Sequence, residues 1–150
     1  MKLHNRTALV TGASKGVGKG IALALGRAGC NVAVNYFSDA VGADETVSEL
    51  RKLGVDAFPI SGDVGRACEV NEMFAALDER FQRIDILVNN AGVQTWGSLL
   101  DLEEAEWDRV MDTNLKGCFL CTQAAGRRMR SRSSGVIVNI GSGSNKVPFP

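Results

Sequence analysis

The stretch that decides the fold is Thr11-Gly12-Ala13-Ser14-Lys15-Gly16-Val17-Gly18, which stands between a short apolar run and an amphipathic segment. The apolar run at 7–11 predicts a strand, and the apolar positions at 17–28 recur with a helical period. Glycine lets the chain turn sharply and lets an anion approach the amide hydrogens at a helix N-terminus. A strand, a glycine-rich turn and a helix in this order are the context of a dinucleotide-binding loop, although a glycine cluster alone can be an ordinary turn.

Outward from this loop, apolar runs alternate with segments of helical periodicity. Strands are expected at 7–11, 32–35, 55–60, 84–88 and 135–140, and helices at 17–28, 39–53, 70–81, 102–114 and 115–130. Such alternation predicts right-handed crossovers and a parallel sheet covered on both faces, whose buried strands are continuously apolar. The sequence therefore predicts one α/β domain over 1–150, with a doubly wound, Rossmann-type parallel sheet.

Composition excludes several classes of protein. The chain has 150 residues, 45% of them apolar and 23% charged, which is typical of a globular domain. Its 17 Lys and Arg balance 17 Asp and Glu, so no basic excess points to nucleic acid as a partner. No apolar run approaches the ~20 residues of a membrane span, and the first residues lack the apolar core of a secretion signal. We expect a cytoplasmic protein with no membrane partner.

Two further chemistries are disfavoured. A nucleotide-hydrolase loop, G-x-x-x-x-G-K-[ST], almost fits at 13–20, but Ala13 replaces its first glycine and Gly20 its magnesium-binding hydroxyl. Cys118 and Cys121 form a C-x-x-C pair, but no second pair or histidine cluster accompanies them, so we expect core packing and no metal site. The single histidine, His4, precedes the first expected strand and is predicted to lie at the surface or to pack.

The glycine spacing G-x-x-x-G-x-G, with four more motifs in register, resembles the short-chain dehydrogenase/reductase family. The other motifs are Asp63-Val64, Asn89-Asn90-Ala91-Gly92, Asn114 in Met111-Asp112-Thr113-Asn114, and Ser142 after Val138-Asn139-Ile140-Gly141. The resemblance covers the whole chain. It implies five of the family's usual seven strands, a nicotinamide cofactor, and hydride transfer between an alcohol and a carbonyl.

The resemblance also implies a set of cofactor-binding residues: Gly12, Ser14, Lys15, Gly16, Val17, Gly18, Asn35, Tyr36, Ser38, Asp63, Val64, Asn90, Ala91 and Gly92. In this interpretation the glycine loop binds the pyrophosphate and the adenosine ribose, and Asp63 accepts a hydrogen bond from the adenine amino group. Ligands of open α/β sheets bind beyond the carboxyl ends of the strands, which agrees with these positions. The alternative is that Asn89 and Asn90 only brace the central strands.

The end of the second expected strand bears on the choice of cofactor. An acidic residue there would pair with a ribose 2′-hydroxyl and repel a 2′-phosphate, and this chain has no carboxylate before Asp39. Lys15 resembles the basic residue of NADP-binding members, although Phe37 stands where many of them carry an arginine. The sequence favours NADP(H), with NAD(H) as the alternative; Lys15 would then be a solvated loop charge.

Two catalytic residues follow from the resemblance. Ser142 would donate a hydrogen bond to the substrate carbonyl oxygen, and Asn114 would help to organise a proton-relay water. Their alternatives are a turn serine and an ordinary polar residue at a helix junction. The family's acid/base is a tyrosine in Y-x-x-x-K beyond the serine, whereas the only tyrosine here is Tyr36. We expect that tyrosine beyond Pro150, in a longer enzyme that is active only with this segment.

Two substrate classes and a second kind of function stay open. The segment 71–114, with Glu106-Trp107, and Asn114-Leu115-Lys116-Gly117 resemble 3-oxoacyl carrier-protein reductases, whereas 146–150 resembles bacterial glucose 1-dehydrogenases. The partner is thus expected to be a small carbonyl or alcohol. The helix at 115–130 lies in a region that family members use to form homo-oligomers, as tetramers or dimers. The alternative function is a truncated, non-catalytic module for dinucleotide binding or oligomerisation.

Overall fold

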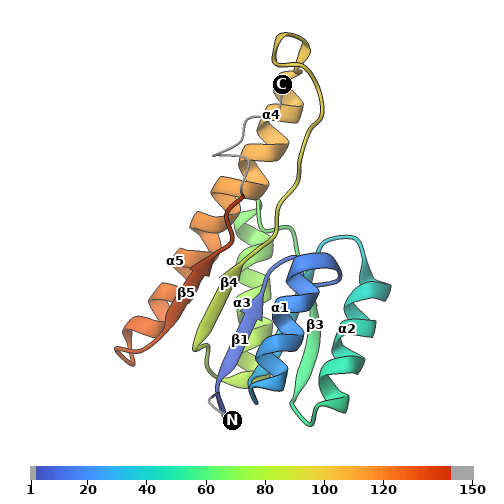
Figure 1. Ribbon diagram of the computed structural model, residues 1–150. Coiled ribbons are helices and arrows are strands. Elements are labelled where there is room, and N and C mark those ends of the chain that lie inside the picture. The colour runs from blue at the N-terminus through green and yellow to red at the C-terminus, as the bar shows by residue number, and fades with distance from the viewer. Residues whose placement is uncertain (1–2, 143–150) are drawn as a thin grey trace.

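The computed structural model describes residues 3–142, and its strands and helices alternate along the chain (Figure 1). In chain order they are β1 (Thr7–Val10), α1 (Gly16–Arg27), β2 (Asn31–Tyr36), α2 (Ala40–Lys52), β3 (Ala57–Ser61), α3 (Ala67–Phe81), β4 (Ile86–Asn89), the 3-10 turn η1 (Leu99–Asp101), α4 (Glu104–Met111), the π-helical turn η2 (Asp112–Lys116), α5 (Gly117–Arg130) and β5 (Val136–Asn139). Within residues 3–142, no helix combines the length and the apolar character that crossing a bilayer requires.

The five strands form one parallel sheet in the order β3-β2-β1-β4-β5. The chain winds outward from β1 to β3, then returns to place β4 on the other side of β1. The α/β, doubly wound fold expected from the sequence is confirmed. Such a reversal of strand order opens a crevice beyond the carboxyl ends of the two strands where it occurs, here β1 and β4.

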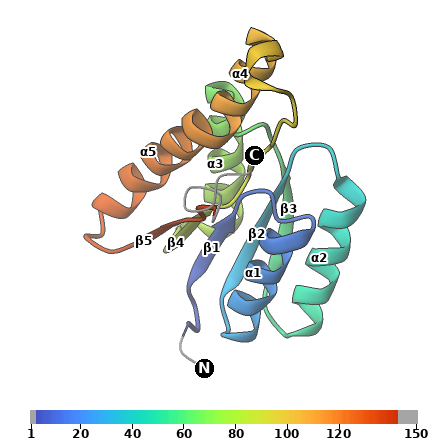
Figure 2. The same cartoon turned by 45° about the horizontal axis from the view of Figure 1, so that its top comes forward.

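Helices cover the sheet from both sides and create two apolar cores (Figure 2). On one side, α3 and α5 bury Phe74 and Leu77 against Leu9 and its neighbours. On the other side, α1 and α2 bury Leu50 against Val10 and the alternate positions of β2. Successive residues of β1 thus face different cores, which explains why this strand is apolar throughout.

The helices expected at 102–114 and 115–130 are not separate. α4, η2 and α5 follow one another without a break and form the long rod in Figure 1. The expected boundary at 114/115 is therefore wrong, because the backbone there widens into a π-helical turn and does not leave the helix. Gly117 follows this turn, and a Cβ atom at this position would lie 2.6 Å from Cγ2 of Val64. The rod therefore approaches the loop after β3 closely.

An ionic cluster joins the amino ends of β1 and β4, opposite the crevice. The Asp85 carboxylate is 3% exposed and accepts hydrogen bonds from Nε of Arg83 at 2.9 Å, Nη1 of Arg6 at 3.1 Å and the backbone N–H of Thr7 at 2.9 Å. Burial by itself raises the pKa of this carboxyl group, but the donors from Arg83, Thr7 and Arg6 outweigh burial and lower the pKa of Asp85.

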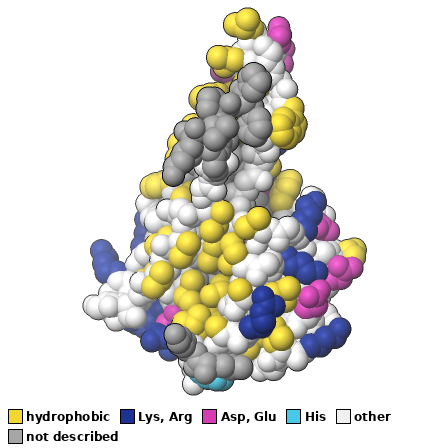
Figure 3. Space-filling model, viewed as in Figure 1, with side chains coloured by type: hydrophobic (Ala, Val, Ile, Leu, Met, Phe, Trp, Pro, Cys, Tyr) yellow, Lys and Arg dark blue, Asp and Glu magenta, His cyan; other side chains and the backbone are white. Residues whose placement is uncertain are grey.

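One face of the sheet beside α1 carries exposed apolar side chains (Figure 3). On β5 and directly after it, Val136 is 56% exposed, Val138 40% and Ile140 41%. Among the described residues, no helix covers β5 on this side, because α1 and α2 pack against the strands on the other half of the sheet.

Candidate functional site

The glycine-rich loop leads from the carboxyl end of β1 into α1. Gly12 has φ +61° and Gly16 φ +56°, a region that side chains disfavour. A Cβ atom at Gly12 would lie 2.9 Å from Cα of Ala91, and one at Gly18 would overlap the carbonyl oxygen of Gly12 and the side chain of Asn90. The glycines therefore allow the loop, the first turn of α1 and the loop after β4 to meet without side chains between them.

The amino end of α1 fits an anion. In the part of the chain that the structure describes, no side chain caps this helix, whose N-cap residue is Lys15, and its first turn contains no acidic residue. The first amide hydrogens of a helix lack intrahelical acceptors and carry a partial positive charge. A phosphate group could accept hydrogen bonds from them, so the donor set suits the pyrophosphate of a dinucleotide.

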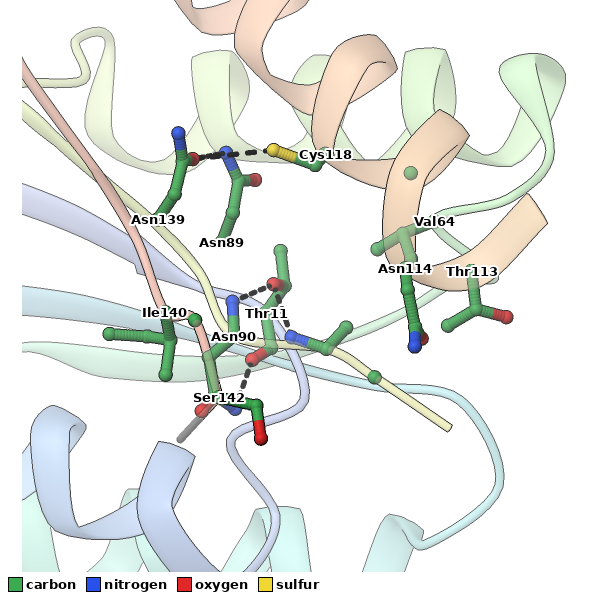
Figure 4. Close-up of a pocket in the computed structure, with 14 residues that line it drawn as sticks. Thr11, Val64, Asn89, Asn90, Thr113, Asn114, Cys118, Asn139, Ile140 and Ser142 are labelled. Atoms are coloured by element: carbon green, nitrogen blue, oxygen red, sulfur yellow. Dashed lines mark hydrogen bonds between the residues drawn. The ribbon is translucent and has the colours of Figure 1, made fainter. Parts of the chain in front are cut away.

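Thr11 fixes the glycine loop to the loop after β4 (Figure 4). Its hydroxyl oxygen accepts hydrogen bonds from the backbone N–H groups of Asn90 and Ala91, both at 2.9 Å, and donates to the carbonyl of Val88 at 3.3 Å. In return, Nδ2 of Asn90 donates to the carbonyls of Thr11 at 2.9 Å and Gly12 at 3.1 Å. These five bonds set the shape of the crevice between β1 and β4.

The two asparagines at the carboxyl end of β4 both brace the sheet. Nδ2 of Asn89 donates to Oγ1 of Thr122 at 3.0 Å and to Oδ1 of Asn139 at 2.9 Å, which connects β4 to α5 and β5. Asn90 braces β1 as described above. Both side chains therefore brace the sheet, and contact between Asn90 and a cofactor stays a prediction.

Two cavities lie along the carboxyl ends of the strands. The β2-side cavity, of about 550 Å³, is lined by Gly12, Ser14, Lys15, Asn35, Tyr36, Phe37, Ser38, Asp39, Gly62, Asp63, Val64, Asn90, Ala91, Gly92, Val93, Arg109 and Thr113. The β5-side cavity, of about 470 Å³, is lined by Thr11, Val64, Asn89, Asn90, Ala91, Gly92, Thr113, Asn114, Gly117, Cys118, Asn139, Ile140, Gly141 and Ser142. Because Val64, Thr113 and the segment 90–92 line both, the cavities form one crevice.

Most residues expected to bind a cofactor line this crevice. Of the described residues, Gly16, Val17 and Gly18 are the expected cofactor contacts that line neither cavity. Gly16 and Gly18 shape the backbone, and the Val17 side chain is 65% exposed. Asn35 lines the β2-side cavity, but the residue is only 2% exposed and its side chain bonds to the backbone: Oδ1 accepts a hydrogen bond from the Gly12 N–H at 3.1 Å.

Asn114 lies in η2 and is tied to the loop after β4. Its Oδ1 accepts from the backbone N–H of Val93 at 2.8 Å, and its Nδ2 donates to the Val93 carbonyl at 2.9 Å. The amide thus pairs with the backbone as a neighbouring strand would. π-helical turns occur frequently at functional sites, because they change the hydrogen-bond spacing of the helix backbone.

Asn114 and Ser142 line the same cavity from two elements. Asn114 comes from η2, and Ser142 from the segment after β5 (Figure 4). They are separated by 28 positions in the sequence, so only the parallel pairing of β4 and β5 brings them to one edge of the sheet. The register pairs Asn89 with Asn139, which places the serine segment beside the loop after β4.

The expected core packing of the C-x-x-C pair is half right. Cys121 is fully buried, and burial raises the pKa of its thiol to about 12. Cys118 is half-buried, lines the β5-side cavity and donates from Sγ to Oδ1 of Asn139 at 3.3 Å. The helical spacing does not distinguish the two residues, because residues three apart on a helix differ in direction by only about a sixth of a turn and so lie on nearly the same face.

Several residues that line the crevice are not predicted from the sequence. Thr11 is one of them, although a hydroxyl at the end of a strand can bind the neighbouring loop. Phe37 and Asp39 also line the β2-side cavity, although the sequence predicts no cofactor contact for either of them. Arg109 gives no local signal in the sequence: it lines the β2-side cavity from α4, where its guanidinium donates to the Gln94 carbonyl in the loop after β4 and binds the Glu106 carboxylate. Between Leu3 and Ser142, no group of His, Cys, Asp and Glu is arranged to hold a metal ion.

Comparison with known proteins agrees with this geometry. Residues 6–150 match the model of the short chain dehydrogenase family. The chain is 46% identical over 145 residues to the 3-oxoacyl-[acyl-carrier-protein] reductase FabG of Staphylococcus aureus (strain Mu50), covering 97% of this chain and 59% of that protein. It is 43% identical over 148 residues to the 3-oxoacyl-[acyl-carrier-protein] reductase of Synechocystis sp., covering 99% of this chain and 60% of the relative.

Solved structures give the same result. A structure from Sinorhizobium meliloti 1021, whose name assigns it to the short-chain alcohol dehydrogenases, matches with a TM-score of 0.94 and 42% identity over 99% of this chain and 59% of the other. The chain thus spans less than two thirds of the length of the relatives it matches. Five motifs in register, a crevice that unites them and the match over 6–150 lead to one conclusion: this chain belongs to the short-chain dehydrogenase family.

Proposed function

We propose that this chain is the dinucleotide-binding part of an oxidoreductase that interconverts an alcohol and a carbonyl with NADP(H), or less favourably with NAD(H). The observation that carries the proposal is the single crevice in which the glycine loop, Asn114 and Ser142 meet. The cofactor, when bound, would supply or accept the hydride. Enclosing cofactor and substrate in one crevice turns their encounter into a reaction between positioned groups.

The two ends of the crevice suit different parts of the ligand. The β2-side cavity is lined by Gly12 and Ser14 of the glycine loop, by Lys15, the N-cap residue of α1, and by Asp63, which would bind the phosphates and the adenosine. Val64, Ala91 and Gly92 line both cavities and would lie along the middle of the cofactor. The β5-side cavity would then hold the reacting end of the cofactor and the substrate.

In this proposal, Ser142 donates its hydroxyl hydrogen to the substrate carbonyl oxygen, whose negative charge grows during reduction. Asn114 acts through the helix: its paired bonds to Val93 hold η2 in place, so that the backbone of the π-helical turn can bind a relay water. The group that donates the proton is expected from the Y-x-x-x-K segment of a longer chain.

For the substrate, we propose a 3-oxoacyl thioester, with a sugar as the competing class. The proposal is supported by the resemblance of segment 71–114 and by the names of the similar Staphylococcus and Synechocystis proteins. A sugar substrate was suggested by residues 146–150, which lie outside the described residues. The cytoplasmic location, the homo-oligomeric state and the boundary of the domain at 1–150 stay predictions.

Two measurements test the proposal. Titration with NADPH and NADH should show binding of both, with NADPH the tighter. A longer chain that includes the expected Y-x-x-x-K segment should then oxidise NADPH with a 3-ketoacyl thioester and should not reduce NADP with glucose. Binding of cofactor without turnover of any carbonyl or alcohol from a broad panel would favour the non-catalytic module instead, and failure to bind either dinucleotide would refute the proposal.

A further inference from the structure

A carboxylate sits at the edge of the β2-side cavity, directly before α2. Asp39 lines this cavity together with Lys15, and it is the N-cap residue of α2. Its Oδ1 accepts a hydrogen bond from the backbone N–H of Gly42 at 3.1 Å. The sequence rules would look for an acidic residue at the end of β2 itself, so this position escapes them although it faces the same cavity.

The amino end of α2 packs against the glycine loop and holds this carboxylate in place. A Cβ atom at Gly42 would lie 2.6 Å from Oδ2 of Asp39 and 2.8 Å from the carbonyl oxygen of Ser14. Oγ1 of Thr46 donates to that same Ser14 carbonyl at 3.4 Å. The Ser14 hydroxyl lies close enough to lower the pKa of the Asp39 carboxyl group. The negative charge is therefore fixed beside the loop that is proposed to bind phosphate.

The charge of Asp39 persists at neutral pH. The Gly42 amide lowers the pKa of this carboxyl group most, followed by the Ser14 hydroxyl and the positive charge of Lys15. The influence of Lys15 means that the two charges lie within electrostatic reach of each other. The other cation of the cavity, Arg109, is paired with Glu106 at 2.8 Å and also donates to the Gln94 carbonyl.

We infer that Asp39 is a specificity-determining residue, whose fixed negative charge beside Lys15 limits the preference of the crevice for a 2′-phosphorylated dinucleotide over its unphosphorylated counterpart. The inference rests on the proposed function, because it concerns the adenosine end of the same crevice. Lys15 attracts a 2′-phosphate, and Asp39 repels it. A neutral 2′-hydroxyl responds to neither charge strongly, so the ratio of the two affinities reflects the balance between these two side chains.

The effect is expected from charge and not from the helix cap. Asparagine caps helices as well as aspartate does, and its oxygen can accept the same bond from Gly42. Asp39→Asn therefore removes the charge and keeps the cap. Asp44→Asn is the matched control, because Asp44 is an exposed residue of the same helix and lies outside the β2-side cavity.

The test is a set of binding titrations of the protein and both variants with NADPH, NADH, 2′,5′-ADP and 5′-AMP. In Asp39→Asn, the Kd ratios NADH/NADPH and 5′-AMP/2′,5′-ADP should rise about fivefold, the effect of one unit charge several ångströms from a doubly charged phosphate in a solvated site. In Asp44→Asn they should change less than about twofold. The rise should shrink as salt is added, because the interaction is screened.

Three results would overturn the inference. The Kd ratios of Asp39→Asn could match those of the unchanged protein, which would leave the proposed function intact and remove only the role of Asp39. Both variants could change the ratios equally, which would indicate net charge alone. If the unchanged protein binds none of the four nucleotides, the proposed function fails together with the inference. Thermal unfolding of each variant, followed by circular dichroism, separates a weakened helix cap from a change in charge.

Discussion

Replacing Thr11 with valine should weaken both the fold and the crevice, although the side chain keeps its shape. The Thr11 hydroxyl accepts hydrogen bonds from the backbone N–H groups of Asn90 and Ala91, each at 2.9 Å. Thr11 itself is only 1% exposed. Valine leaves these two amides without that acceptor. An unsatisfied donor costs about 1–3 kcal/mol, and since the two amides are only partly buried we take the lower end, about 2 kcal/mol for the pair.

The matched control is Thr11→Ser, which keeps the hydroxyl and loses one methyl group. Removing a buried methyl group costs about 1 kcal/mol, so serine should be the milder change although it is the less similar in volume. Urea unfolding measures the difference: at a slope of about 2 kcal/mol per molar, Thr11→Val should lower the midpoint by about 1 M. Circular dichroism is the suitable probe, because Trp96 and Trp107 are 85% and 53% exposed and report weakly on folding.

The order of the two variants decides the matter. If Thr11→Val is as stable as the unchanged protein, or more stable than Thr11→Ser, the hydroxyl does not hold the loop and our account of the crevice is wrong. A second readout is dinucleotide affinity, which should fall more in Thr11→Val than in Thr11→Ser, since the loop at 90–92 lines both cavities.

Three further predictions concern other parts of the chain. Gly18→Ala should abolish dinucleotide binding in a titration, because its methyl group would overlap the glycine loop. Gly20→Ala has open space around it and should bind the dinucleotide normally. Its free energy of unfolding should rise by about 1 kcal/mol, the difference in helix propensity between alanine and glycine, and its unfolding temperature should rise with it. Asp85→Asn should lower the free energy of unfolding by about 1–3 kcal/mol at pH 7. Because the pKa of Asp85 is lowered in the folded protein, the stability that this carboxylate contributes is present above about pH 4 and is lost as the pH falls through the folded pKa. In denaturant titrations, the difference in free energy of unfolding between the variant and the unchanged protein should therefore disappear at low pH. A difference that stays constant with pH would contradict this. Labelling with a thiol reagent at pH 8 should modify exposed Cys68 rapidly and buried Cys121, whose pKa is about 12, only after unfolding, as mass spectrometry of the digested protein would reveal.

The sequence predicted those features that depend on local patterns. Alternation of apolar runs and helical periods predicted the strands and the parallel sheet, because each unit is decided by residues near it in the chain. The loop at 11–18 was found for the same reason. Apolar periodicity predicts a boundary at Asn114, where the structure has a π-helical turn, because a widened turn shifts the phase of the apolar positions and makes one continuous helical segment resemble two helices.

The contacts across the crevice could not be read from local patterns. The bond between Thr11 and Asn90 joins two loops, and neither loop shows alone which hydrogen bonds it will make with the other. Asp39 illustrates the same limit: a rule tied to the last residues of β2 overlooks a carboxylate that reaches the cavity from the helix cap. Side chains that act through tertiary neighbours need the three-dimensional arrangement.

The central position of β1 has a consequence for the order in which this protein assembles. The whole glycine loop is synthesised within the first 18 residues, but the amides that Thr11 holds come from positions 79 and 80 residues later. Contacts of such long range form late, because the chain between them must first be ordered. A nascent chain that ends at β3 therefore has the nucleotide loop without the neighbour that shapes it. Affinity for a dinucleotide should arise in one step, when β4 docks beside β1, and should report that step during refolding.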